Sequence, residues 1–238
     1  AGTDMDMVSC GFLNTLAESL KEGKVTEEQI NTACRRVLEA KYKLGLFSDP
    51  YKYCDTLRTK DVLYADVHRA AAREIAAETF VLLKNTDNLL PLEQKGRIAL
   101  IGPMADARNN MCGMWSMTCT PSRHATLLES LRSAVGDKAE ILYAKGSNIY
   151  YDERLEKGAV GIRPLERGDN RQLLDDALAT AARADIIVAA LGECAEMSGE
   201  SASRTNLNIP DAQQDLLKAL VKTGKPVVLL LFTGRPLV

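Results

Sequence analysis

The sequence predicts an α/β fold in which helices flank a mostly parallel sheet. Two observations support this fold class. From residue 97 onward, short strand patterns alternate with longer helical ones, an order typical of parallel strands joined by helical crossovers. The strand patterns are also almost continuously apolar, as expected for a sheet that is covered on both faces.

The first clear element is a helix near the start of the chain. Thr26 and Gln29 are spaced as a capping box, which places the first helical turn at residue 27. Apolar residues then recur at helical spacing until Gly45, which predicts the end of the helix. A polar, aromatic segment without periodicity follows, and we interpret residues 51–60 as a linker.

The remaining elements follow in alternation. The expected helices are 66–78, 125–135, 171–183 and 211–222. The expected strands are 97–101, 140–143, 185–191 and 226–232. A polar segment at 150–170 shows little periodicity, so we expect a surface excursion there.

Composition excludes several classes of function. Thirty basic and 32 acidic residues give a net charge of −2, so we expect neither nucleic acid nor an anionic membrane as a partner. The longest apolar run, Val227–Phe232, is far shorter than the roughly 20 residues of a membrane span. Six cysteines without a CxxC pair leave the redox state open.

Both ends of the sequence resemble cuts in a longer protein. The chain begins at Ala1 without an initiator methionine or leader and stops shortly after the strand expected at 226–232. An apolar strand left at a sheet edge favours pairing with another copy, so we expect self-association.

Two long loops follow expected strands, after residues 101 and 191. Ligands of open parallel sheets collect at the carboxyl ends of strands, and both loops exceed the usual length of such connections. Because both project from the same edge, we expect residues 102–124 and 192–210 to approach each other.

Three carboxylates make the second loop a candidate for acid–base chemistry. Glu193, Glu196 and Glu200 lie within it, with Ser198 and Arg204 nearby. A loop carboxylate acts as a general acid when burial or a neighbouring carboxylate raises its pKa. The alternative is a solvated acidic loop in which Arg204 forms a structural ion pair.

Residues 191–217 resemble the signature of family 3 glycoside hydrolases around their acid/base glutamate. Three further segments resemble that family in its own order: 1–7, 43–47 and the stretch from 76 through 105. The signature positions are Leu191, Gly192, Ser198, Gly199, Glu200, Arg204, Leu207, Pro210 and Gln213.

This resemblance implies a (β/α)8 barrel joined to an α/β sandwich. Residues 1–50 would be the C-terminal tail of the barrel domain, 51–60 the linker and 61–238 the sandwich domain, truncated at its C-terminus. The family's nucleophilic aspartate and its Lys-His pair would lie upstream of Ala1. The missing barrel domain of the same protein is therefore an expected partner.

The resemblance also implies a retaining, exo-acting β-glycosidase, most closely a β-glucosidase. Glu200 would be its acid/base, supported by Ser198 and Arg204, and a glycoside or oligosaccharide its substrate. Relatives with this domain order indicate a periplasmic or secreted protein. We expect no cofactor, and no activity from this chain alone.

Trp115, the only tryptophan, has two interpretations. It is either an anchor packed against the domain or a platform on which a sugar stacks, and the resemblance favours an aglycone contact. Cys112, Cys119 and His124 are not spaced like a zinc site, so we expect no metal.

Two alternative functions remain besides a non-catalytic interaction domain, against which the carboxylate-rich long loop argues. One is a β-xylosidase or another exo-glycosidase of the same family. The other is a small-molecule-binding α/β module, although the Gly102-Pro103-Met104 turn has no phosphate-binding glycine pattern.

Overall fold

The computed structural model describes residues 2–116, 118–156 and 166–238, and the chain forms two compact units. The first is Ala1–Asn85 and the second Thr86–Val238. The middle of the expected excursion at 150–170 lies outside the described residues. No helix in the described ranges is long and apolar enough to cross a bilayer.

The first unit is helical. Its helices are α1 (Gly11–Lys21), α2 (Glu27–Lys43), α3 (Arg58–Val62) and α4 (Asp66–Glu78). The capping box of α2 is confirmed, because Thr26 Oγ1 accepts from Gln29 N at 3.2 Å and Thr26 N donates to Gln29 Oε1 at 2.9 Å. The sequence did not predict α1, and α3 overlaps residues 58–60 of the expected linker.

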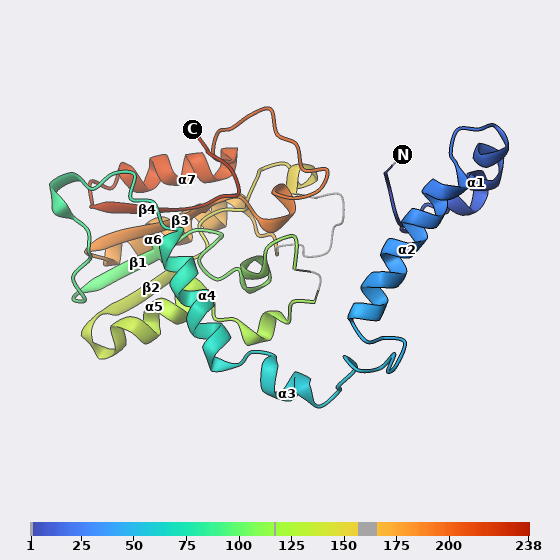
Figure 1. Ribbon diagram of the computed structural model, residues 1–238. Helices are drawn as coiled ribbons and strands as arrows, with labels where there is room; N and C mark the ends of the chain where they lie inside the picture. Colours follow the sequence, from blue (N-terminus) through green and yellow to red (C-terminus); the bar gives the residue numbers. More distant parts are fainter. Residues whose placement is uncertain (1, 117, 157–165) are drawn as a thin grey trace. The chain divides into compact units, whose positions relative to one another are not determined.

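The second unit contains a four-stranded parallel sheet (Figure 1). The strand order is β2-β1-β3-β4, with Ala99 of β1 aligned to Leu142 on one side and Ile187 on the other. The bounds are β1 Arg97–Ile101, β2 Glu140–Ala144, β3 Ile186–Gly192 and β4 Val227–Phe232. The predicted fold class of a parallel sheet flanked by helices is confirmed.

Successive residues of each strand feed two separate cores. Ile98 and Leu100 pack on the face that carries α5 (Leu127–Val135). Ala99 and Ile101 pack on the opposite face, with α6 (Asn170–Arg183) and α7 (Asp211–Val221). Both faces of the sheet are therefore covered, which is why its strands read as unbroken apolar runs.

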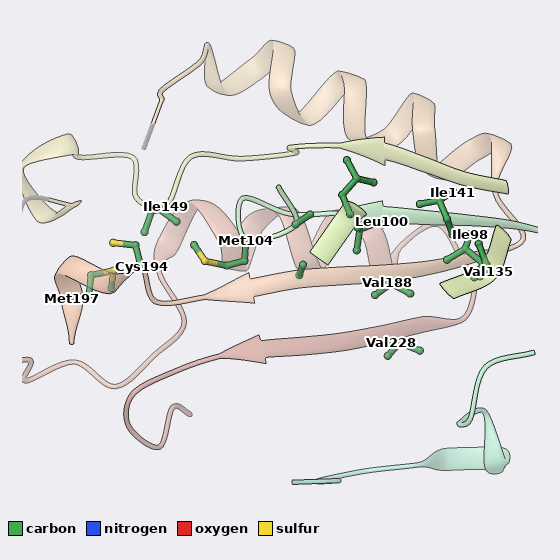
Figure 2. Packing of buried hydrophobic residues seen from close by; sticks show 13 residues of the cluster. Ile98, Leu100, Met104, Val135, Ile141, Ile149, Val188, Cys194, Met197 and Val228 are labelled. Carbon is green, nitrogen blue, oxygen red and sulfur yellow. The ribbon is translucent and has the colours of Figure 1, made fainter. Parts of the chain in front are cut away.

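The core on the α5 face continues into the loops at the carboxyl edge. Figure 2 shows Met104, Cys194 and Met197 in the same cluster as Leu100 and Val188. Met104 follows β1, while Cys194 and Met197 follow β3. These apolar side chains fix the starts of both long loops to the sheet.

Candidate functional site

The two long loops meet at the carboxyl edge of the sheet. They follow β1 and β3, which are hydrogen-bonded neighbours. In the order β2-β1-β3-β4, the chain goes from β1 to β2 on one side and from β3 to β4 on the other. Ligands bind at such a reversal in open α/β sheets. Ala195 N donates to Asn110 Oδ1 across the two loops, so the predicted approach of the loops is confirmed.

The two loops also come into close contact at Gly199 of the second loop. A Cβ atom at Gly199 would collide with the side chain of Met114. The residue before Glu200 therefore lies directly against the first loop.

Glu193 is the buried centre of the second loop. The residue is 4% exposed, and its Oε1 accepts a hydrogen bond from Arg204 Nη1. Its Oε2 accepts from Thr233 Oγ1 and from Gly234 N, both at 3.3 Å. A buried carboxylate is tolerated only when it is paired and hydrogen-bonded, and Glu193 meets both conditions.

Arg235 is a second cation on this carboxylate, and the sequence did not indicate it. Its Nε lies 3.2 Å from Glu193 Oε1 without forming a hydrogen bond. Its Nη2 donates to the carbonyl oxygens of Met197 at 2.6 Å and Ala202 at 3.1 Å. The segment after β4 thus supports the loop after β3.

The three glutamates of the loop have different environments. Glu193 is buried and paired, and Glu196 is 6% exposed with an Oε2 that finds no partner among the described residues. Glu200 is exposed. Of these three carboxylates, only Glu200 is presented outward by the second unit, where it could reach a ligand.

The two supporting residues predicted from the sequence both shape this loop. Arg204 pairs with Glu193 and also donates from Nη2 to Asn208 O at 2.9 Å, so it forms the structural ion pair considered above. Ser198 Oγ lies against Gly234, where a side chain would collide with it. Arg204 thus links the buried Glu193 to the later part of the loop, and Ser198 lies against the segment after β4.

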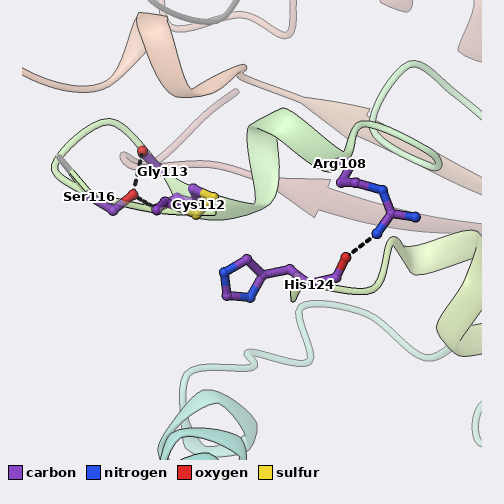
Figure 3. Close-up of a disulfide and its surroundings, with 6 residues drawn as sticks. Arg108, Cys112, Gly113, Ser116 and His124 are labelled. Carbon is purple, nitrogen blue, oxygen red and sulfur yellow. Dashed lines mark hydrogen bonds between the residues drawn. A yellow bond between two sulfur atoms is a disulfide. The ribbon is translucent and has the colours of Figure 1, made fainter. Parts of the chain in front are cut away.

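Trp115 lies in the short segment that the Cys112–Cys119 disulfide closes. Figure 3 shows this disulfide beside Ser116. Cys112 and Cys119 are joined, with their Cα atoms 6.1 Å apart. Ser116 Oγ donates to the Cys112 and Gly113 carbonyl oxygens at 2.6 and 3.2 Å. The Trp115 side chain is 68% exposed, so within this unit it is not a buried anchor.

The same disulfide bears on metal binding. The ligand atoms of Cys112, Cys119 and His124 lie within 4.8 Å of one another. Zinc binds cysteine as the thiolate, and the disulfide occupies both sulfurs. Arg108 donates to the His124 carbonyl oxygen and pairs with Glu129 of α5, which ties this loop to the helix.

Two further buried groups lie close to the end of β3, the Gln213 side chain and the Cys194 thiol. Gln213 of α7 is fully buried; its Nε2 donates to Gly192 O at 2.8 Å and Ile149 O at 3.3 Å, while its Oε1 accepts from Gly192 N at 2.7 Å. The end of β3 is fixed in this way. Burial raises the pKa of the Cys194 thiol to about 11, so this cysteine is a neutral packing residue at physiological pH.

Comparisons with known proteins agree on one family. The domain described as "Glycosyl hydrolase family 3 C-terminal domain" matches residues 80–238. A periplasmic beta-glucosidase of Salmonella typhimurium is 42% identical over 100% of this chain and 32% of its own length. A beta-xylosidase of Formosa agariphila is 32% identical, with the same two coverages.

Solved structures show the same relationship. The crystal structure of a β-glucosidase from Listeria innocua in complex with isofagomine matches with a TM-score of 0.79 and 32% identity. The match covers 99% of this chain and 30% of that one. The chain thus spans about a third of the length of the curated relatives above.

Proposed function

The chain belongs to glycoside hydrolase family 3, and on that premise we propose that its Glu200 is the general acid/base of a retaining, exo-acting β-glycosidase. The observation that carries this proposal is the contrast among the loop glutamates. Glu193 is buried and paired with arginines, Glu196 is buried, and Glu200 is exposed. A general acid must come within hydrogen-bond reach of the bond it cleaves.

The chemistry divides between two carboxyl groups. Glu200 would donate its proton to the departing glycosidic oxygen while a carboxylate from the barrel domain attacks the anomeric carbon. Glu200, now ionised, would then take a proton from the water that hydrolyses the glycosyl–enzyme intermediate. The cycle restores both groups, and it requires them to lie roughly 5–5.5 Å apart.

Trp115 is the second contact that we assign to the substrate. Its exposed ring suits stacking against the aglycone, and the Cys112–Cys119 disulfide restrains the loop that presents it. Ser198 and Arg204 support the backbone around Glu200.

The substrate is a terminal β-linked glucoside. The 42% identity to a named beta-glucosidase favours this assignment. The named beta-xylosidase at 32% identity makes a β-xyloside the second candidate. By the same relationship to the Salmonella protein, we place the parent in the periplasm.

We extend the proposal to the domain boundaries that the resemblance implies. Residues 1–50 belong to the end of a barrel domain, 51–60 link the domains and 61–238 form the sandwich domain.

The isolated chain should not turn over glycosides, because it would lack the nucleophile. It should self-associate through β4, which is the outer strand of the described sheet and leaves Leu229 40% exposed.

The deciding experiment replaces Glu200 by alanine in the full-length parent enzyme. Activity on an aryl β-glucoside should fall, and azide should restore turnover with formation of a β-glycosyl azide, because a small anion then attacks the intermediate without base assistance. Glu93→Ala, at an exposed glutamate paired with Lys95, is the matched control. Near-normal activity of the Glu200→Ala enzyme, or no effect of azide, would refute the assignment.

A further inference from the structure

The turn that carries Glu200 is held at both ends by one guanidinium group. Arg235 Nη2 donates to Met197 O at 2.6 Å and to Ala202 O at 3.1 Å. These carbonyl groups flank residues 198–201, with Glu200 between them. A single side chain therefore sets the distance between the two ends of the turn.

The turn needs this external support. Ser201, directly after Glu200, has φ +59°, a left-handed conformation that is unfavourable for a residue with a side chain. Such a conformation persists only when surrounding contacts impose it. The contact between Gly199 and Met114 and the contact between Ser198 and Gly234 restrict the turn further.

Glu193 in turn fixes Arg235. Gly192 of β3 is aligned with Phe232 of β4, and Glu193 N donates to Phe232 O at 2.8 Å. The carboxylate of Glu193 then lies 3.2 Å from Arg235 Nε and also accepts from Gly234 N. The chain of contacts runs from the β3–β4 ladder through Glu193 and Arg235 to the turn.

We propose that Arg235, held by Glu193, is a positioning residue that sets the orientation of Glu200 for proton transfer. This inference rests on the proposed acid/base role of Glu200. Arg235 would act only through the backbone of the turn. Lysine could keep the charge, but it has no planar fork with which to bind two carbonyl groups while facing the Glu193 carboxylate.

The test is the dependence of kcat/KM on the leaving group, measured with full-length Arg235→Lys. A poor leaving group needs the acid and an activated one such as dinitrophenolate does not. Since a misplacement near 1 Å costs about 100-fold in rate, we expect kcat/KM to fall roughly 10- to 100-fold for the poor leaving group and little for the activated one. The ratio of the two constants is independent of how much of the enzyme is folded.

Two further variants make the result decisive. Arg154→Lys, at an exposed arginine paired with Asp152, should leave the ratio at the wild-type value. Glu193→Gln should move it in the same direction as Arg235→Lys. If Glu200→Ala changes the ratio and Arg235→Lys does not, the positioning role is wrong and the proposed function stands. If Glu200→Ala itself leaves the ratio unchanged, the proposed function is wrong.

Discussion

Met114 packs so closely against Gly199 that a Cβ atom at position 199 would collide with its side chain. This contact joins the loop after β1 to the loop after β3 one residue before Glu200. The position of the candidate acid/base therefore depends on a residue of the other loop. We therefore expect that a substitution at this contact in either loop will disturb the site.

Gly199→Ala in the full-length enzyme should lower kcat/KM for an aryl β-glucoside by about tenfold or more, because the added methyl group displaces the turn. Met114→Ala should remove the clash with Cγ and leave only its Cβ, 3.1 Å away, so the double variant should recover most of the lost activity. A double-mutant cycle measures this coupling. Met111→Ala, at an exposed methionine of the same loop, is the control, and a double variant no better than Gly199→Ala would contradict the contact.

The Cys112–Cys119 disulfide should stabilise the first loop. Replacing both cysteines by serine should lower the free energy of unfolding by about 2–3 kcal/mol for a loop this short. It should also raise KM for an aryl glucoside more than it lowers kcat, because Trp115 is then held less firmly. Urea titrations of the chain and kinetics of the full-length enzyme measure the two effects.

A reducing agent separates the disulfide from the serine substitutions. It should bring the wild-type protein toward the stability of the double variant and leave the variant unchanged. Cys34→Ser, at an exposed free cysteine, is the matched substitution and should have little effect. If reduction leaves the free energy of unfolding of the wild-type protein unchanged, the disulfide contributes nothing to stability.

The sheet could be predicted from the sequence because its strands are nearly continuous apolar runs, of which the inner strands β1 and β3 are buried on both faces. The strand expected at 226–232 appears as Val227–Phe232, and the one at 185–191 as Ile186–Gly192. The helix α1 was missed because it lacks a sequence signal at its start: Cys10 has φ 55° and gives no side-chain cap. Local patterns specify an element only where capping or periodicity is strong.

The site was predictable only in part. The long loops could be found from strand ends and loop length, and the family resemblance singled out Glu200 among the three loop glutamates. The role of Glu193 could not, because it depends on the pairing of β3 with β4, which brings Arg235 beneath the loop. Strand order is a tertiary property, and the sequence of Thr233–Arg235 alone does not indicate which loop it will support.

Gln213→Ala should destabilise the chain through unsatisfied buried groups. The substitution leaves Gly192 N, Gly192 O and Ile149 O without their amide partner, a loss of about 3 kcal/mol in the free energy of unfolding. Gln214→Ala, on the next residue of α7, removes only the 2.7 Å bond to Ile209 O and should cost about 1 kcal/mol. Urea titration compares them, and equal losses would refute the special role of Gln213.

Cys194 should make stability depend on alkaline pH. Burial raises the pKa of its thiol from 9.0 to about 11, so the folded state retains a proton that the unfolded state releases as pH rises above 9.0. The stabilisation is complete below the unfolded pKa and is lost progressively as pH rises toward the folded one. Relative to Cys194→Ala, the free energy of unfolding should therefore fall by about 1 kcal/mol between pH 8 and pH 10.

This difference is best measured by urea titration in a background with serine at the exposed cysteines, Cys10, Cys34 and Cys54. The background suppresses exchange between free thiolates and the Cys112–Cys119 disulfide. Restoring the exposed Cys34 thiol is the control, and it should add no comparable pH dependence. If the difference in unfolding free energy between the background protein and its Cys194→Ala variant stays constant up to pH 10, the thiol ionises as readily in the folded state as in the unfolded one.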